Sequence, residues 1–334
     1  MLNYSVAELR YNRYIIQQFT KYMFEIIRYT PDKADEWNQF IAKSKNGTFL
    51  FDRNYMDYHS DRFHDYSLLF YREGKLFGLL PANIQEDTLH SHQGLTYGGL
   101  IMNEKTIAEH VQQLFRELNE WLKIKGIKKV VYKPVPHIFH SIPAEEDLFS
   151  LYSICNAQII DRSLSTAIDL IRPLAWHRDR KYGINRSAKN GVTIEESNNW
   201  SSFWQILSEN LMEKYGAHPV HTLQEIELLH SRFPQQIKLF TACRENEVLG
   251  GTVIYLTPQV AHTQYISANK EGKHLRVIDA LFHELFQHYQ WDCHYFNFGT
   301  SNGEDGHILV EPLIHQKEGF GGRGICYDTY EWEP

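Results

Sequence analysis

Two short polar segments with a similar pattern decide how this chain of 334 residues is read: residues 72–78, with the sequence REGKLFG, and residues 244–250, with the sequence RENEVLG. Each lies between two apolar runs, which are residues 66–71, 76–84, 237–243 and 248–256. Short apolar runs on both sides of a polar turn are typical of an antiparallel β-hairpin. The repeated pattern therefore predicts two hairpins, one in each half of the chain.

The segments that follow each hairpin repeat in the same order. A strand-like segment comes first, then a helix with apolar residues at helical spacing, then another strand. The expected elements are residues 96–102, 107–122 and 128–133 after the first hairpin, and residues 260–267, 275–289 and 293–298 after the second. Helices also lead into each half. This order predicts a mixed α/β fold of mostly antiparallel sheets covered by helices, although two hairpin turns alone could resemble each other by chance.

The matched order predicts a duplicated domain. We expect an N-terminal domain over residues 1–165 and a C-terminal domain over residues 166–334, with residues 22–161 and 167–332 superimposable. A chain of this length is also more typical of two domains than of one.

Composition and charge exclude several classes of protein. Hydrophobic residues make up 43% and charged residues 22%, which is typical of a folded globular chain. A net charge of −7 argues against a general nucleic-acid coat protein but leaves a local basic groove open. The four cysteines have no CxxC spacing and are expected as reduced thiols. We see no signal-peptide core and no membrane-spanning run, so we expect a cytoplasmic protein without an integral membrane segment.

A basic segment precedes the second hairpin. At 100° per residue, Arg178, Lys181, Arg186 and Lys189 fall within about 140° of a helix. We expect this face to border the cleft and to hold a phosphate or another anion of the substrate. An ordinary solvated surface is the alternative. We expect no metal, because His283 and His288 are five residues apart and cannot share a helix face.

The end of the chain resembles a known family. Residues 296–306, FNFGTSNGEDG, and residues 317–322, KEGFGG, resemble the C-terminal signature of the FemAB-like branch of the GNAT acyltransferase superfamily. Residues 186–192, RSAKNGV, resemble that family's basic helix end. The resemblance implies two tandem GNAT-like (acyl-CoA N-acyltransferase-like) domains that transfer an acyl group to an amine. In the best-known members the donor is aminoacyl-tRNA and the acceptor is a peptidoglycan precursor.

One segment departs from the simple GNAT enzymes. Their coenzyme A pattern, Gln/Arg-x-x-Gly-x-Gly/Ala before the long helix, is replaced by residues 269–274, NKEGKH, with a single glycine. Tight wrapping of a pyrophosphate by this loop is therefore doubtful, although a helix end still favours an anion. The donor remains either aminoacyl-tRNA or acyl-CoA, and no bound cofactor is predicted with certainty.

The resemblance and the chemistry of acyl transfer together indicate candidate catalytic and binding residues. The family places a lysine near the donor, which implies that Lys317 stabilises charge on the acyl carbonyl or on the donor's ribose or phosphate. A surface lysine is the alternative. Tyr265 or Ser267 could assist the leaving group beside backbone N–H groups of residues 265–268. In the terminal signature, Asn297, Thr300 and Ser301 are expected to bind substrate.

These observations favour an acyl or aminoacyl transferase that modifies an amine of a cell-envelope precursor or other glycoconjugate, as in cell-wall biogenesis. Two alternatives stay open. One is an acetyl-CoA dependent N-acyltransferase acting on an amino-sugar. The other is a non-catalytic module that binds an anionic glycan or a nucleotide-sugar.

Overall fold

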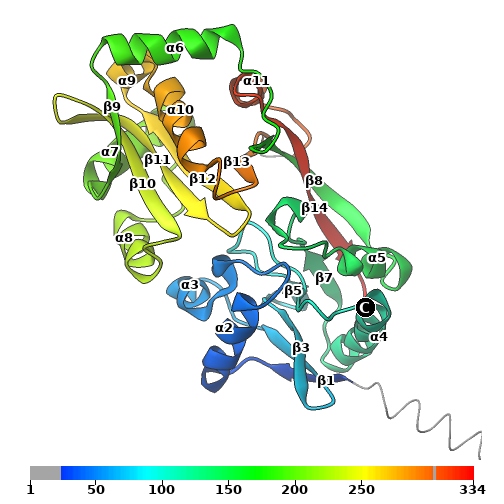
Figure 1. Cartoon of the computed structure of the whole chain (residues 1–334). Coiled ribbons are helices and arrows are strands. Elements are labelled where there is room, and N and C mark those ends of the chain that lie inside the picture. The colour runs from blue at the N-terminus through cyan, green and yellow to red at the C-terminus, as the bar shows by residue number, and fades with distance from the viewer. Residues whose placement is uncertain (1–23, 304–305) are drawn as a thin grey trace, which may run out of the picture. The chain divides into compact units, whose positions relative to one another are not determined.

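The computed structural model describes residues 24–303 and 306–334. The chain divides into two compact units, of which one comprises the residues up to Ile160 together with Asp328–Pro334 and the other comprises Asp161–Tyr327 (Figure 1). The predicted division into residues 1–165 and 166–334 stays a prediction. In the structure the end of the chain returns to the first unit, which the sequence did not indicate.

The first unit contains two small sheets. Its elements are β1 (Phe24–Arg28), α2 (Ala34–Ala42), α3 (Arg53–Met56), β2 (Leu68–Arg72), β3 (Lys75–Leu80), β4 (Asn83–Gln85), β5 (Thr88–His90), β6 (Ile101–Met102), α4 (Ala108–Ile124), β7 (Lys129–Tyr132) and α5 (Glu146–Ser153). One sheet is antiparallel, in the order β1-β2-β3-β6. In the other, β5 pairs with β4 and, in parallel, with β7.

The first hairpin forms as the sequence predicts, but its second strand is shorter. The pairing runs from Leu68 opposite Leu80 to Arg72 opposite Lys75, and Glu73 and Gly74 make the turn with positive φ angles of 52° and 72°. The expected strand over residues 76–84 is wrong in extent, because β3 ends at Leu80 and β4 starts at Asn83 in the other sheet. Pro81 lies between them and has no N–H to donate to a sheet.

The second unit is built on one mixed sheet. Its elements are β8 (Gln158–Asp169), α6 (Arg178–Lys189), β9 (Thr193–Ser197), α7 (Trp200–Tyr215), α8 (Leu223–Arg232), β10 (Ile237–Arg244), β11 (Glu247–Leu256), β12 (Val260–Ala268), α9 (Lys270–Leu275), α10 (Val277–Tyr289), β13 (Tyr295–Thr300), α11 (Glu311–Gly319) and β14 (Arg323–Trp332). The start of β8, up to Ile160, and the end of β14, from Asp328, belong to the first unit. Within the unit the strand order is β8-β13-β12-β11-β10-β9. The pair β12 and β13 is parallel, which fits the connection between them through α9 and α10.

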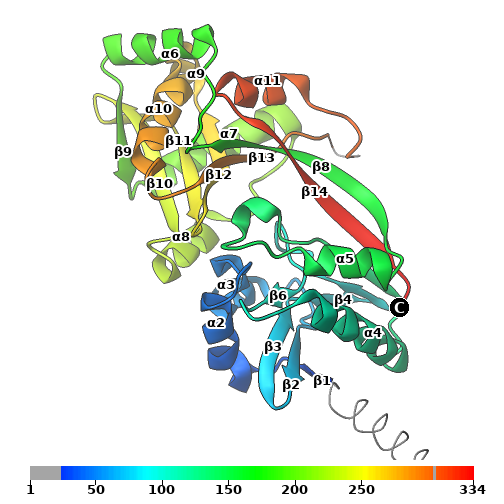
Figure 2. The ribbon, with the colours of Figure 1, turned by 45° about the vertical axis from the view of Figure 1, so that its right-hand side comes forward.

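Helices cover both faces of this sheet (Figure 2). The alternation of β12 shows this directly, since successive side chains of a strand point to opposite faces. Tyr265 packs against Trp204 of α7, and Ser267 accepts a hydrogen bond from Asn210 of the same helix. The intervening Ile266 packs with the core around α10, as Ala268 packs with Val277. The side chains of one strand thus reach both helical layers.

Within residues 24–303 and 306–334, no helix is both long enough and apolar enough to cross a membrane.

Candidate active site

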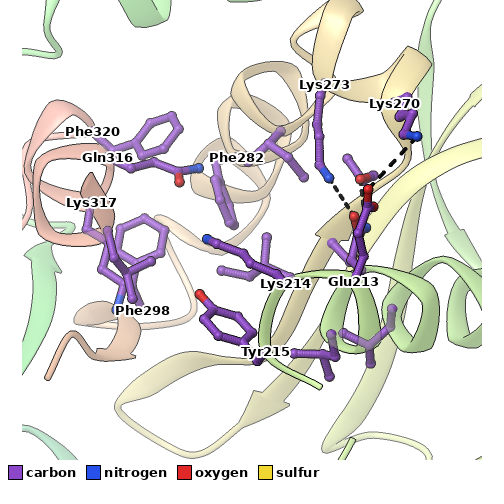
Figure 3. Close-up of a pocket in the computed structure, with 18 residues that line it drawn as sticks. Glu213, Lys214, Tyr215, Lys270, Lys273, Phe282, Phe298, Gln316, Lys317 and Phe320 are labelled. Atoms are coloured by element: carbon purple, nitrogen blue, oxygen red, sulfur yellow. Dashed lines mark hydrogen bonds and ion pairs between the residues drawn. The ribbon is translucent and has the colours of Figure 1, made fainter. Parts of the chain in front are cut away.

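A cavity opens where β12 and β13 diverge. The two strands are paired in parallel from Val260 to His262 and from Tyr295 to Asn297. Beyond this register they line a common cavity of about 650 Å³, to which β12 contributes Ile266, Ser267 and Ala268 and β13 contributes Phe298 (Figure 3). The separation of two strands in the middle of the sheet therefore creates a site inside the second unit.

Most of the cavity wall is apolar. Leu207 and Leu211 come from α7, Ile278 and Phe282 from α10, and Leu313 and Phe320 from α11 or its end. The aromatic rings lie edge to face, with centroids 5.0 Å apart for Phe282 and Phe298 and 5.2 Å apart for Phe282 and Phe320. Rings packed in this way form a rigid wall. An uncharged group, such as an acyl chain, fits this part of the cavity.

Lysines form much of the polar part of the cavity lining. Lys214, Lys270 and Lys273 line it together with a single carboxylate residue, Glu213. Lys270 lies 4.0 Å from the Glu213 carboxylate, and Lys273 donates a hydrogen bond to Asn210. Lys214 extends into the cavity towards Phe298, above Tyr215 (Figure 3). The excess of cations makes this rim attractive to an anion such as a phosphate.

The N-terminus of α9 is already capped by the side chain of Asn269. The Asn269 Oδ1 atom accepts a hydrogen bond from the Gly272 N–H at 2.8 Å. A Cβ atom at Gly272 would lie 2.3 Å from the Leu249 carbonyl oxygen, so the glycine is required for close packing. This amide is therefore not free to hold a pyrophosphate, and lysine side chains remain as the anion-binding groups of the rim.

Lys317 lines the cavity, but its ammonium group is turned inwards to the backbone. The Nζ atom donates to the carbonyl oxygens of Gly299 at 2.9 Å and Thr300 at 2.7 Å and to Ser301 Oγ at 2.8 Å. The residue is only 5% exposed, and burial lowers the pKa of Lys317 to about 8. No carboxylate in the described parts of the chain pairs with it. Lys317 is thus a buried cation that fixes the end of β13.

The expected substrate-binding residues of the terminal signature belong to the same internal network. Asn297 is fully buried and donates to Ser165 Oγ at 2.9 Å, while its Oδ1 atom accepts from His262 Nδ1 at 2.7 Å. Burial lowers the pKa of His262 to about 4, so this ring is neutral. Ser301 is also fully buried, whereas the side chain of Thr300 is exposed. None of these three lines the lysine-rimmed cavity.

Tyr265 and Ser267, the other two predicted catalytic residues, differ in position. Ser267 lines the cavity, and its Oγ atom accepts a hydrogen bond from Asn210 Nδ2 at 2.8 Å. Tyr265 does not line the cavity, and its hydroxyl lies 2.6 Å from His221 Nδ1. Burial raises the pKa of Tyr265 to about 12. The structure therefore brings Lys317 and Ser267 to one cavity and leaves Tyr265 outside it.

The predicted basic face forms a helix but does not line this cavity. Arg178, Lys181 and Lys189 are exposed on α6, and Arg186 contacts the ring of His274 at 2.7 Å. Of the four, Lys181 lines a second cavity on the other side of α10. α6 instead packs on α10 through Gly183, which lies against Asp279, and on the end of α9 through Ser187, whose hydroxyl donates to the Leu275 carbonyl oxygen at 2.7 Å.

Sequence reasoning missed the lysines of the rim. Lys270 and Lys273 lie in α9, within the residues 269–274 that replace the coenzyme A pattern, and Lys214 lies at the end of α7. The available signal was the charge of residues 270–273 just after a predicted strand. The neighbouring Gln316 of α11 had no sequence signal at all.

Comparison with known proteins identifies the fold. No protein-family model and no curated protein matches the sequence. The crystal structure of FemX is similar over 93% of this chain and 97% of its own, with a TM-score of 0.66 and 11% identity. L-PGS from Bacillus licheniformis is similar over 91% and 92%, with a TM-score of 0.54 and 14% identity. A tandem GNAT protein from the clavulanic acid biosynthesis pathway is similar over 93% of this chain and 98% of its own, with a TM-score of 0.50 and 12% identity.

These likenesses extend over nearly the whole chain and include proteins built from two GNAT domains. They confirm the predicted mixed α/β class and, at the level of the fold, the predicted resemblance to the FemAB-like branch. The chain has the tandem GNAT fold that is also found in FemX.

Proposed function

We propose that this chain is an acyl or aminoacyl transferase that moves an acyl group from a phosphate-bearing donor to an amine of a cell-envelope precursor or other glycoconjugate. The observation that carries the proposal is the cavity between β12 and β13, whose lining combines an apolar wall with lysines. A donor of acyl groups can use both environments, because the hydrocarbon part of its acyl end packs on an apolar wall and its carrier bears phosphates.

The rim favours aminoacyl-tRNA as the donor. Its lysines, Lys214, Lys270 and Lys273, act as separate point charges on flexible side chains. Phosphates spaced along a nucleic-acid backbone match such separate charges. A coenzyme A pyrophosphate is instead held by the backbone of a glycine-rich loop in simple GNAT enzymes, and here Asn269 occupies the amide of Gly272.

For the proton of the leaving group we propose Ser267. In the reaction the acceptor nitrogen forms a bond to the acyl carbon, the bond from that carbon to the ribose oxygen breaks, and this oxygen takes up a proton. The Ser267 hydroxyl accepts from Asn210 and has only a long contact of 3.5 Å to the Ile206 carbonyl oxygen for its own proton. It can therefore donate to the leaving oxygen and recover a proton from the amine.

Lys317 acts as a positioning residue in this proposal. Its hydrogen bonds hold the peptide units of Gly299 and Thr300 at the end of β13. Its charge also lies in a buried environment beside the cavity, where electrostatic stabilisation of a developing oxyanion is stronger than in water. Tyr265 has no direct part, because its hydroxyl contacts His221.

The names of similar proteins support the general class. One structure that resembles 76% of this chain, with a TM-score of 0.54 and 12% identity, is the C-terminal domain of a protein from Agrobacterium fabrum named as a lysylphosphatidylglycerol synthetase. That name describes attachment of an amino acid to an envelope lipid. The fold is therefore compatible with aminoacyl transfer to envelope components, which is the reaction class proposed here.

An acetyl-CoA dependent N-acyltransferase is the second candidate. It is suggested by the likeness to the tandem GNAT protein, whose structure is named as a form without AcCoA. A non-catalytic module that binds an anionic glycan or nucleotide-sugar is the third. Turnover of aminoacyl-tRNA would support the first candidate, and turnover of acetyl-CoA would support the second. Binding without any turnover would support the third.

The proposal is tested by mass spectrometry of cell-envelope precursors from cells that carry the gene, lack it, or carry Gln316→Trp. Gln316 lines the cavity, so a tryptophan there obstructs it. We expect a precursor with an added acyl or aminoacyl mass with the parental gene, and not in cells that lack the gene or carry Gln316→Trp. Glu318→Trp on an exposed position of the same helix is the matched control and should behave like the parent. Identical precursors in all strains would contradict the proposal.

A further inference from the structure

A second, separate cavity lies between α6 and α10. It has a volume of about 540 Å³ and shares no lining residue with the lysine-rimmed cavity. Its apolar lining consists of Ile168, Leu170, Pro173, Trp176, Ile184 and Phe286. Trp176 is held in place by rings at one end, with centroids 5.3 Å from Phe286 and 5.2 Å from Phe320. A cavity of this size and apolar character is typical of a small-ligand site.

The cavity continues along the helices as an apolar groove. An adjoining cavity of about 310 Å³ shares Ile184 and His283 with it. This extension is lined by Ala188, Val192, Ile194 and Ala280, among others. The two cavities therefore follow α6, whose 12 residues span about 18 Å. We call the combined space the α6–α10 groove.

The charges of the groove differ between its two parts. Lys181 lines the larger part, where the other polar side chains are neutral or imidazole groups: Asn185, His283, Gln287 and Gln290. It is exposed, and within the described residues no carboxylate pairs with it. Glu284 is the carboxylate of the extension and lies on the opposite helix. An anion is thus favoured beside Lys181 and disfavoured in the extension.

We propose that the α6–α10 groove binds an anionic amphiphile with a single alkyl or acyl chain. Its chain lies on Ile168, Leu170 and Phe286 and runs past Ile184, and its carboxylate or phosphate head pairs with Lys181. The length of the groove and its apolar floor fit an extended chain, whose apolar surface is removed from water there. The site is independent of the transfer reaction proposed above.

The test is calorimetric titration of the full chain with dodecanoate below its critical micelle concentration. We expect saturable binding of one molecule per chain. Lys181→Glu should weaken binding at least tenfold, because it replaces attraction of the head group by repulsion. Lys189→Glu makes the same charge change on an exposed position of the same helix, outside both cavities, and should alter binding less than twofold.

Two further titrations separate the roles of the chain and the head group. Ile184→Trp should abolish binding, since Ile184 lines both parts of the groove. Dodecyltrimethylammonium, with a positive head, should bind the parent more weakly than dodecanoate does and bind Lys181→Glu more tightly than it binds the parent. Thermal melting shows whether each variant is folded, and Lys181→Gln gives a milder loss if the charge reversal disturbs α6.

Three outcomes would overturn the proposal. One is the absence of saturable binding to the parent below the critical micelle concentration. Another is an equal effect of Lys181→Glu and Lys189→Glu, which would indicate a general charge effect. The third is unchanged dodecanoate binding by folded Ile184→Trp, which would place the amphiphile elsewhere.

Discussion

Asn297 and Lys317 both form hydrogen bonds with the backbone of Gly299, one with its N–H group and the other with its carbonyl oxygen. Asn297 Oδ1 accepts a hydrogen bond from the N–H of Gly299 at 3.0 Å, and Lys317 Nζ donates to the carbonyl oxygen of Gly299 at 2.9 Å. Gly299 has a φ angle of +70°, in the region that favours glycine. The register between β13 and β8 shifts at this point. The bend that directs the end of β13 beside the cavity is therefore fixed by two buried side chains.

Replacement of Lys317 should lower stability. In Lys317→Met the carbonyl oxygens of Gly299 and Thr300 and the hydroxyl of Ser301 lose their shared donor. Unsatisfied buried polar groups cost about 1–3 kcal/mol each, partly offset because a buried charge is removed. We expect a net loss on the order of 1–3 kcal/mol at pH 7 in urea unfolding. Lys189→Met, at an exposed site, should stay within about 0.5 kcal/mol of the parent.

The same pair of proteins gives a pH test. Burial lowers the pKa of Lys317 from 10.5 to about 8, so between these values the unfolded chain binds more protons at this residue than the folded chain. Stability of the parent relative to Lys317→Met should therefore rise as pH increases from about 8 to 10.5, by about 3 kcal/mol in total. A difference in unfolding free energy that is constant across this range would contradict the assignment of a low pKa.

A rim lysine should control affinity for the donor. Lys214→Glu is expected to weaken binding of an RNA acceptor-stem hairpin on the order of tenfold and to reduce the salt dependence of that binding, because one phosphate contact is lost. The measurement is a fluorescence-anisotropy titration at several salt concentrations. Lys189→Glu carries the same charge change away from the cavity. Equal weakening by both variants would show that only overall charge matters.

The contact between α6 and α10 tolerates no side chain at Gly183. A Cβ atom there would lie 1.9 Å from the carboxylate of Asp279, which is 1% exposed and pairs with Arg180 at 2.9 Å and Arg276 at 2.7 Å. Gly183→Ala should therefore destabilise the protein by about 1–3 kcal/mol despite the better helix propensity of alanine. Asn185→Ala on the same helix is the control. A melting temperature for Gly183→Ala at or above that of the parent would mean that the helices separate easily.

A buried carboxylate in the first unit should make stability depend on pH. Asp147 accepts a hydrogen bond from Tyr132 at 2.6 Å, and burial raises the pKa of Asp147 to about 6. The folded state therefore holds this proton more tightly than the unfolded state, and its contribution is lost as pH rises from about 4 to 6. Asp147→Asn should lose less stability than the parent over that range. The measurement is urea unfolding at several pH values, and identical slopes for the two proteins would exclude this role.

The sequence pattern was sufficient to predict those helices and hairpins that depend on interactions between nearby residues. The hairpin around Glu73 and Gly74 and the hairpin of β10 and β11 were predictable because apolar runs flank a polar turn. The helix Arg178–Lys189 was also predictable from its periodicity. Its packing was not, because the fit of Gly183 against Asp279 joins positions far apart in the sequence.

The site was predictable only in part for the same reason. Lys317 and Ser267 do line one cavity. Nothing near Lys317 in the sequence shows, however, that its ammonium group donates hydrogen bonds to Gly299, Thr300 and Ser301. Tyr265 shares a strand face with Ser267, but the neighbouring His221 takes its hydroxyl. Such contacts depend on tertiary packing, which a linear pattern does not contain.

The central claim is that the cavity between β12 and β13 holds the acyl end of the donor. The most direct test is equilibrium binding of an acceptor-stem RNA hairpin with an amino acid attached at its 3′ end through a stable amide. We predict saturable binding by the parent and by Glu318→Trp, and at least tenfold weaker binding by Gln316→Trp, with little difference among the three for the same RNA without the amino acid. Equal affinity of Gln316→Trp and the parent for the aminoacylated RNA, with both proteins folded, would contradict the claim.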